Sequence, residues 1–431
     1  MILFDGKTYD SSEQDRLLNE LAERIPVILS RATLSPEVVI DAVDKLRLDT
    51  MAGRFDDLLT EFPKDIAESY KIQAASLLSP EHLRKKLKTE LGDTEEYITD
   101  PMDGFSRIRV KKMPLGVLFH ISAGNMDFLP AYSLAEGLLA GNINILKLPS
   151  ADNGLSLKLI MQLIEYRPEL KDYIYVFDTA STDIQGMRKM AELSNAISVW
   201  GSDMAIEAVR GLAPTGAKII EWGQKLGFCY VSKLSEVADA EDELKGLAKH
   251  IAATKQLLCS SCQVIYVDTE NMEDVRAFAE RFLPLLENAA NENATEEIGI
   301  RARDTLNSYT RRLKGYLGEE EKNENVLRGR GVSLILQPDS RLEISPMMCN
   351  VLVKPLPKKA VGKVLYESRY HLQTAGLICP DEERKELAET FIRGGLVRVT
   401  KGADMSAYFP GECHDGEYAL NRYMRTVNIE E

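Results

Sequence analysis

From Leu115 onward, short apolar runs alternate with helical stretches, and this alternation limits the chain to few folds. The apolar runs are Val117 to Ile121, Ile143 to Leu148, Tyr173 to Phe177, Ile197 to Trp200 and Lys218 to Ile220. Repeated strand–helix units of this kind predict a parallel, doubly wound α/β sheet. Ligands bind such sheets at the carboxyl ends of the strands, so we expect a cofactor near the loops after Ile121, Leu148 and Trp200.

The first hundred residues are expected to be helical. Ser35-Pro36-Glu37 and Ser79-Pro80-Glu81 are typical helix starts, because serine caps the helix, proline suits its first turn and the acid suits its dipole. A second α/β segment follows residue 226. Within it, the polar interval from Asn288 to Arg330 is expected to be mostly helix and solvated loop.

Composition excludes several classes of function. The chain has 67 acidic and 53 basic residues, a net charge of −14, and no separate basic block, so nucleic acid is not an expected partner. No stretch approaches the roughly 20 apolar residues that cross a bilayer. The N-terminus lacks a basic region followed by an apolar core, so we expect a cytoplasmic protein whose six cysteines are thiols.

Cys259 lies in a polar turn of small residues directly before the β-branched run that ends at Val267. A nucleophile needs such a place, exposed at the end of an element but backed by rigid structure. The alternative is a buried structural cysteine. Cys259 and Cys262 also form a C-x-x-C pair, which suggests zinc or a dithiol. The chain has no second pair, which argues against a four-ligand zinc site.

Three other polar residues end predicted strands. Glu221 follows an apolar strand and precedes Gly223, and it is either a general base or a solvated acid. Asn125, after Gly124, offers an amide donor to an oxyanion, and Lys147 offers an amine to a cofactor ribose or phosphate. A helix-capping Asn and a Lys with its head group in solvent are the respective alternatives.

The histidines do not show metal-ligand spacing. His120 lies within an apolar strand and is expected to be a satisfied core residue. The other four are expected in polar surroundings, and they are His82, His250, His371 and His414.

Taken in order, these motifs resemble those of the aldehyde dehydrogenase superfamily. The stretch from Pro114 to Pro149 is similar to the family's P-L-G-V-x-x-x-I-x-x-x-N followed by A-G-N-x-x-x-x-K-P, with Leu148 interposed. Val199-Trp200-Gly201-Ser202 resembles the family's G-S turn after a strand. Glu221-Trp-Gly-Gln-Lys225 resembles its E-L-G-G-K. The family's catalytic cysteine follows that motif within a few dozen residues, and Cys259 follows Glu221 by 259 − 221 = 38 residues.

The resemblance extends to the C-terminus and covers roughly three quarters of the chain. Gly411 to Tyr423 and Arg425 to Ile429 resemble the family's terminal G-E-Y-x-L helix and oligomerising strand. Within the superfamily, three further motifs are similar to those of acyl-CoA reductases, typified by the fatty acyl reductase of bacterial luminescence operons. They are Q-x-x-C-S-S-x-Q at 256–263, W-G-x-x-x-A-I at 200–206 and L-Q-T-x-G at 372–376.

The resemblance implies an aldehyde dehydrogenase-like α/β fold in three parts. Residues 1–225 would hold a helical N-terminal segment and the dinucleotide-binding domain, 226–395 the catalytic cysteine, and 396–431 a bridging and oligomerisation segment. Cys259 would be the thiolate nucleophile, and the Asn125 side chain and the Cys259 backbone amide would bind the oxyanion. The residues implied to line the dinucleotide are Lys147, Ser150, Gly201, Ser202 and Gly223.

Two departures from the family pattern concern the cofactor. Ser150 stands where many NAD-using members have an acid, which removes a carboxylate that would repel a ribose 2′-phosphate. NADPH is therefore the expected cofactor, with NADH as the alternative. The family's E-I-F-G-P-V, whose Glu grips the nicotinamide ribose, is represented by Pro346 to Val351, which has no acid.

The implied activity is the NADPH-dependent reduction of a fatty acyl thioester to the aldehyde. The acyl donor would be acyl-CoA or an acyl-protein synthetase that acts as a partner. One alternative is an aldehyde dehydrogenase that forms the free acid with Glu221 as its base, and another is a non-reducing partner that carries the acyl group on Cys259. The strand Thr426 to Ile429 implies a homodimer or homotetramer.

Overall fold

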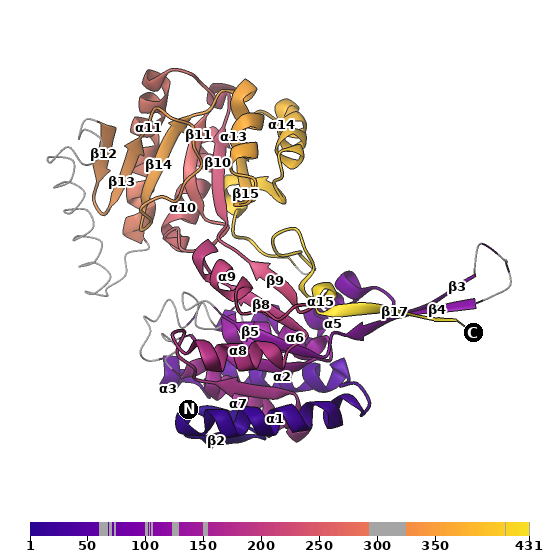
Figure 1. The fold of residues 1–431 in the computed structure, drawn as a ribbon. Coiled ribbons are helices and arrows are strands. Elements are labelled where there is room, and N and C mark those ends of the chain that lie inside the picture. The colour runs from indigo at the N-terminus through magenta and orange to yellow at the C-terminus, as the bar shows by residue number, and fades with distance from the viewer. Residues whose placement is uncertain are drawn as a thin grey trace. The chain divides into compact units, whose positions relative to one another are not determined.

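The chain folds into two compact units, which are described separately (Figure 1). The first unit comprises Met1–Gly223 with Phe409–Glu431, and the second comprises Gln224–Tyr408. The computed structural model describes residues 1–59, 68, 71–72, 75–99, 102, 104, 107–122, 129–149, 154–292, 325–409 and 411–430. In these residues, no helix is both long and apolar enough to cross a bilayer.

The first unit contains a seven-stranded sheet of order β2-β1-β7-β6-β5-β8-β9. Its five parallel strands are β5 (Val117–Ile121), β6 (Ile143–Lys147), β7 (Ile174–Phe177), β8 (Ala196–Trp200) and β9 (Lys218–Trp222). All five lie where the apolar runs predict strands. The strand order reverses beside β5, which is the topological switch point where ligands bind in sheets of this kind.

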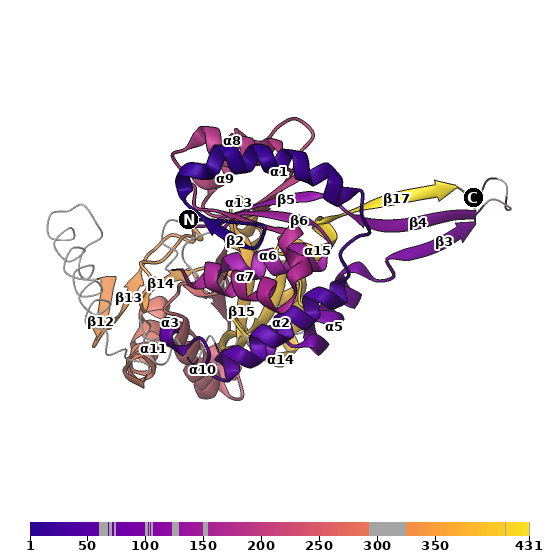
Figure 2. The same ribbon diagram turned by 90° about the horizontal axis from the view of Figure 1, so that it is seen from below.

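Helices cover both faces of this sheet (Figure 2), because successive strand residues point to opposite faces. Leu118 and Leu146 pack toward one face with α2 (Pro36–Met51), α6 (Leu129–Leu139) and α7 (Leu155–Tyr166). Phe119 and Ile145 pack toward the other face with α1 (Gln14–Leu29), α8 (Ile184–Glu192) and α9 (Asp203–Arg210). The remaining described helices of this unit are α3 (Asp56–Leu59), α5 (Pro80–Leu91), α15 (Ala419–Arg422), η1 (Ser11–Glu13) and η2 (Pro168–Asp172).

The expectation that the first hundred residues are helical is wrong at both ends, for the first nine residues and for the strand Glu95–Thr99. β1 (Ile2–Phe4) and β2 (Lys7–Tyr9) form a hairpin, and β1 pairs antiparallel with β7 at the edge of the sheet. The turn residues Asp5 and Gly6 have φ of 50° and 73°, and Asp-Gly is a sequence that favours such a two-residue turn. Further on, α2 and α5 begin at Pro36 and Pro80 as predicted, and Ser79 caps α5 by accepting from the His82 amide at 3.2 Å.

A separate three-stranded sheet of order β17-β4-β3 extends from the first unit (Figures 1 and 2). It contains β3 (Glu95–Thr99), β4 (Arg107–Pro114) and β17 (Met424–Glu430). β17 pairs antiparallel with β4 from Met424 opposite Pro114 to Glu430 opposite Ile108. The C-terminal strand expected from the sequence is therefore present, and it occupies an edge of this sheet.

The second unit contains a second seven-stranded sheet, of order β12-β13-β14-β11-β10-β15-β16. Its strands are β10 (Leu226–Val231), β11 (Cys262–Val267), β12 (Val326–Gly329), β13 (Val332–Leu336), β14 (Asn350–Pro355), β15 (Leu372–Ile378) and β16 (Arg398–Lys401). Its helices are α10 (Ala240–Thr254), α11 (Met272–Glu292), α13 (Val361–Glu367), α14 (Asp381–Arg393), η3 (Leu234–Glu236), η5 (Lys358–Ala360) and η6 (Gly402–Asp404). α10 and α11 pack on one face, and α13 and α14 pack on the other. Most of the polar interval from Asn288 to Arg330 lies outside the described residues.

Candidate active site

Cys259 lies in the turn that joins α10 to β11 in the second unit. All six cysteines are within the described residues: Cys259 is exposed, Cys413 is half-buried and the other four are buried. Cys262, the second member of the C-x-x-C pair, is buried and its thiol donates to the Val264 carbonyl at 3.4 Å. The two cysteines therefore occupy different environments, and the exposed one stands in the position that a nucleophile requires.

Contacts on several sides hold the cysteine turn in place. The Leu258 amide donates to the Ser261 hydroxyl at 3.1 Å, and the Ser261 amide donates to the Leu258 carbonyl at 3.0 Å. The hydroxyls of Ser260 and Ser406 lie 2.8 Å apart. Behind the turn, a Cβ added to Gly227 would lie 2.7 Å from the carbonyl oxygens of both Ser260 and Ser261. Only glycine allows strand β10 to approach the turn so closely.

His250 also supports this turn, and the expectation that it sits in polar surroundings is wrong. It is buried on α10, and its Nε2 accepts from the Cys262 amide at 3.4 Å. Burial lowers its pKa to about 4, and the nearby Arg398 charge acts in the same direction. The ring is therefore neutral at pH 7, which leaves Nε2 able to accept. His120, by contrast, is the satisfied core residue that was predicted, with Ser133 and Asn144 each 2.9 Å from its ring nitrogens.

The backbone before the cysteine is strained. Lys255 and Gln256 have φ of 47° and 63°, and a facing segment has three more left-handed residues, Met347, Met348 and Cys349, with φ of 64°, 50° and 62°. This conformation costs about 1–2 kcal/mol for each residue that carries a Cβ. The Met348 amide donates to the Lys255 carbonyl at 2.9 Å, so the two strained segments contact each other. Strain of this kind persists only where surrounding contacts enforce it.

Lys147 ends β6 in the first unit and is buried, with 4% of its surface exposed. Its Nζ donates to the Ser181 hydroxyl at 3.1 Å. Burial lowers the pKa of the amine, and the Asp178 carboxylate partly opposes this shift. An ammonium has three donors, so this amine can also bind a hydroxyl or phosphate oxygen of a ligand.

Gly201 and Ser202 follow β8 and begin α9. Ser202 caps this helix by accepting from the Ala205 amide at 3.4 Å. A Cβ on Gly201 would lie 3.1 Å from the Ala205 side chain, and one on Gly223, just after β9, would lie 3.2 Å from Ile206. Small residues thus keep the start of α9 close to the strand ends, and a helix start attracts phosphate.

The predicted dinucleotide residues of the first unit therefore lie along one edge of its sheet. Lys147 ends β6, Gly201 and Ser202 follow β8, and Gly223 follows β9, and the carboxyl ends of these parallel strands lie along this edge. A buried amine together with a glycine-flanked helix start fits the ribose and pyrophosphate of a nicotinamide dinucleotide. Ser150 and Asn125, the other two residues expected near this edge, lie outside the described residues.

Glu221 forms a bidentate ion pair with Arg210. The Arg210 guanidinium donates from Nε at 2.6 Å and from a terminal nitrogen at 2.8 Å, so both carboxylate oxygens are engaged. The pair joins β9 to the end of α9, and the Glu221 side chain is 30% exposed. Each carboxylate oxygen keeps a second lone pair beside the one that accepts from Arg210, so the general base and the solvated acid both stay predictions for Glu221.

Aromatic rings fix the predicted C-terminal motif to the ends of β8 and β9. Trp200 and Trp222 stack with centroids 5.1 Å apart, and His414 lies 5.1 Å and 5.3 Å from these two rings. The Arg422 guanidinium lies 4.6 Å from the Trp222 centroid, a favourable cation–π distance. The segment that resembles the family's terminal helix thus packs against the strands that carry Gly201 and Glu221.

Sequence analysis assigns no role to the residues that hold the cysteine turn. In the sequence, Gln256 and Gln263 are visible only as the two glutamines of the Q-x-x-C-S-S-x-Q motif, the second of them within an apolar strand. Both side chains are buried. The contacts of Gly227, Ser345 and Arg210 depend on which elements pack together, and no local pattern signals them.

Comparison with known proteins identifies relatives across most of the chain. A sequence model of the acyl-CoA reductase (LuxC) family matches residues 36–426. The long-chain acyl-protein thioester reductase of Vibrio harveyi is 22% identical over 362 residues, which cover 83% of this chain and 72% of that protein. The enzyme of the same name from Aliivibrio fischeri is 22% identical over 329 residues, which cover 74% of this chain and 65% of that protein.

Solved structures of aldehyde dehydrogenases share the fold. Aldehyde dehydrogenase 21 of Physcomitrella patens, determined with its reaction product succinate, matches with a TM-score of 0.72 and 13% identity over 98% of this chain and 91% of its own. A lactaldehyde dehydrogenase matches with a TM-score of 0.68 and 15% identity over 99% and 92% of the two chains. The predicted α/β fold of the aldehyde dehydrogenase type is confirmed.

Proposed function

The chain belongs to the acyl-CoA reductase (LuxC) family, and we propose that it reduces a long-chain fatty acyl thioester to the aldehyde through an acyl group carried on Cys259. Family membership makes it an acyl-reducing oxidoreductase. The observation that supports Cys259 as the nucleophile is its exposure on a turn whose backbone is fixed from behind by Gly227 and from the side by His250.

In the proposed mechanism, the Cys259 thiolate attacks the acyl carbonyl, and the sulfur of the donor leaves as a thiolate. The acyl group then forms a thioester with Cys259. A thioester accepts hydride more readily than an oxygen ester, and the cysteine sulfur leaves as a thiolate. The Asn125 side chain and the Cys259 amide donate to the oxyanion that forms at each tetrahedral step. Collapse of the thiohemiacetal anion releases the aldehyde and regenerates the thiolate.

We propose that Lys147, Gly201, Ser202 and Gly223 hold NADPH, with Ser150 beside the ribose 2′-phosphate. When bound, the reduced nicotinamide supplies the hydride. Lys147 supports this assignment because its buried amine ends a strand at the switch-point edge, and the start of α9 favours a pyrophosphate. The absence of an acid at position 150 favours NADPH over NADH.

The proposed acyl donor is acyl-CoA or an acyl-protein synthetase, since four relatives, among them that of Vibrio harveyi, are named acyl-protein thioester reductases. We also propose that β17 pairs across a subunit interface to form a homodimer or homotetramer. It is an edge strand of seven residues, and an exposed edge of this length favours pairing with another chain. Light scattering of the intact protein measures this directly.

The test of the activity is the loss of NADPH absorbance with acyl-CoA esters of increasing chain length. We expect aldehyde from the parent and none from Cys259→Ala, with slower turnover when NADH replaces NADPH. Oxidation of aldehydes to free acids, with no reduction of acyl-CoA by either cofactor, would instead identify a hydrolytic dehydrogenase.

A further inference from the structure

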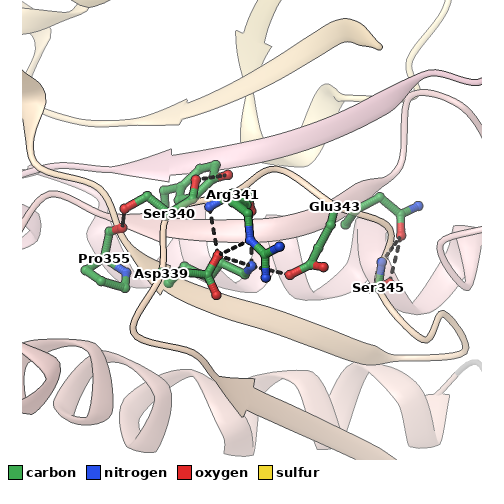
Figure 3. A network of polar contacts seen from close by, with 9 residues as sticks. Asp339, Ser340, Arg341, Glu343, Ser345 and Pro355 are labelled. Atoms are coloured by element: carbon green, nitrogen blue, oxygen red, sulfur yellow. Dashed lines mark hydrogen bonds and ion pairs between the residues drawn. The ribbon is translucent and has the colours of Figure 1, made fainter. Parts of the chain in front are cut away.

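The segment 337–349, between β13 and β14, is anchored at its start by a fully buried lysine. Lys354 of β14 has no exposed surface, and its Nζ donates to Asp339 at 3.1 Å, to the Arg341 carbonyl at 3.0 Å and to Glu343. Figure 3 shows Asp339, Arg341 and Glu343 of this network, with Ser340 on one side of it and Ser345 beyond Glu343 on the other. The lysine thus fixes residues 339–343, and this places Ser345, two residues further on, in a defined position.

Ser345 connects this segment to both ends of the cysteine turn. Its hydroxyl donates to Gln263 Oε1 at 2.7 Å and accepts from Gln256 Nε2 at 2.8 Å, and its amide also donates to Gln263 Oε1, at 3.2 Å. Gln256 lies three residues before Cys259, and Gln263 lies four residues after it. The serine therefore holds the two residues that bracket the nucleophile.

The side chain of each glutamine also donates to a backbone carbonyl at the opposite end of the turn. Gln263 Nε2 donates to the Gln256 carbonyl at 2.9 Å, and Gln256 Nε2 donates to the Cys262 carbonyl at 2.9 Å. Both side chains and Ser345 are almost completely buried, with exposed fractions of 0%, 3% and 4% for Gln256, Gln263 and Ser345. Water cannot readily replace these contacts, so the closed ring of amides and hydroxyl enforces the left-handed backbone at Gln256.

We infer that Gln256, Gln263 and Ser345 form a clamp that positions Cys259 for attack on the acyl thioester. The clamp reaches the nucleophile through the backbone of residues 257–261, so its members are positioning residues. The clamp also fixes the position of residues 347–349 relative to the cysteine turn, because the Met347 amide donates to Ser345 Oγ at 3.0 Å. The inference rests on the proposed role of Cys259.

The clamp makes a specific prediction about two reactions of the same thiol. Acyl transfer requires the sulfur to approach a bound carbonyl in one direction, and a misplacement of about 1 Å can slow such a step about a hundredfold. Alkylation by iodoacetamide requires only an accessible thiolate. Loosening the clamp should therefore slow acyl transfer far more than alkylation.

The experiment compares Ser345→Ala with Ser340→Ala, which serves as the matched control. Each removes one hydroxyl from the same segment, but Ser340 bonds to the Pro355 carbonyl, at 2.6 Å, at the other end of the network (Figure 3). Single-turnover acylation by a long-chain acyl-CoA, without nicotinamide cofactor, is followed by intact-protein mass spectrometry. Alkylation of Cys259 is followed in parallel by peptide mass spectrometry, and the unfolding midpoint of each variant is recorded.

We expect Ser345→Ala to be acylated at least about tenfold more slowly than Ser340→Ala, with alkylation rates within about threefold. Gln263→Glu, which keeps the acceptor for Ser345 but removes the donor to the Gln256 carbonyl, should also acylate slowly. Ser345→Thr, which retains the hydroxyl, should recover much of the rate. In steady state, the losses should appear in kcat more than in KM for the acyl donor.

Two results would overturn the inference while leaving the activity intact. One is acylation of Ser345→Ala and Gln263→Glu at the rate of Ser340→Ala, and the other is an equal fall of acylation and alkylation. Failure of the parent to acquire an acyl group on Cys259 would overturn the proposed function, and the clamp's role with it.

Discussion

Replacing Gly227 by alanine tests how closely the cysteine turn must be held. The added Cβ would lie 2.7 Å from two backbone carbonyl oxygens, whereas ordinary contacts begin at 3.4 Å, so the turn must move by about 3.4 − 2.7 = 0.7 Å. Because the clashing atoms belong to the backbone of Ser260 and Ser261, no change of side-chain rotamer can relieve the contact. A displacement of this size next to a nucleophile should lower kcat by about tenfold to a hundredfold.

The same clash has a smaller effect on stability. Overpacking of a folded interior costs about 1–3 kcal/mol, and each kcal/mol lowers the unfolding midpoint of a unit this size by about 2–4 °C. Gly362→Ala is the control, since Gly362 lies on α13 in the same unit and a Cβ there meets nothing within 4 Å. The assay is acyl-CoA-dependent loss of NADPH absorbance on fully folded protein. Parental kcat in folded Gly227→Ala would refute the reasoning.

Three further predictions concern other residues. Asn125→Ala should lower kcat on the order of a hundredfold without changing the unfolding midpoint, and parental activity would remove its oxyanion role. Glu221→Gln should retain acyl-CoA reduction in the NADPH assay, because no reductive step needs a base, and loss of its partly exposed pair with Arg210 should cost about 0–1 kcal/mol in urea unfolding. Burial lowers the pKa of His120 from 6.5 to about 4, so the unfolded state binds a proton that the folded state does not between these pH values. Stability should rise with pH across this window, by about 3 kcal/mol from His120, and urea unfolding of His120→Gln should show a correspondingly shallower dependence.

The parallel strands were predictable because each is an apolar run long enough to be recognised by itself. Val117–Ile121 and Ile143–Lys147 are buried on both faces, and seven of their ten residues are apolar. The hydrophobic pattern does not predict the hairpin of Ile2–Phe4 and Lys7–Tyr9, because each strand has only three residues and the second strand is mostly exposed. Its Asp5-Gly6 turn was the available signal.

The cysteine turn could be predicted from local sequence, but its supports could not. A polar turn before a β-branched strand is visible in the letters around Cys259. The bond from Gln256 to Ser345 instead spans 89 positions, and the contact of Gly227 depends on a register shift between β10 and β11. Such contacts depend on which strands pair and on the register of each pair, and hydrophobic periodicity specifies neither of these.

The ion pair at Glu221 gives this acid a structural role in the first unit. A carboxylate acts as a base for water only when an oxygen lone pair faces that water. Here each oxygen accepts one hydrogen bond from Arg210 and keeps a second lone pair, so the ion pair does not exclude a role as a base. The pair joins β9 to the end of α9, and Glu221→Gln separates this structural contribution from any contribution to catalysis, because the amide keeps the size of the side chain but removes its charge.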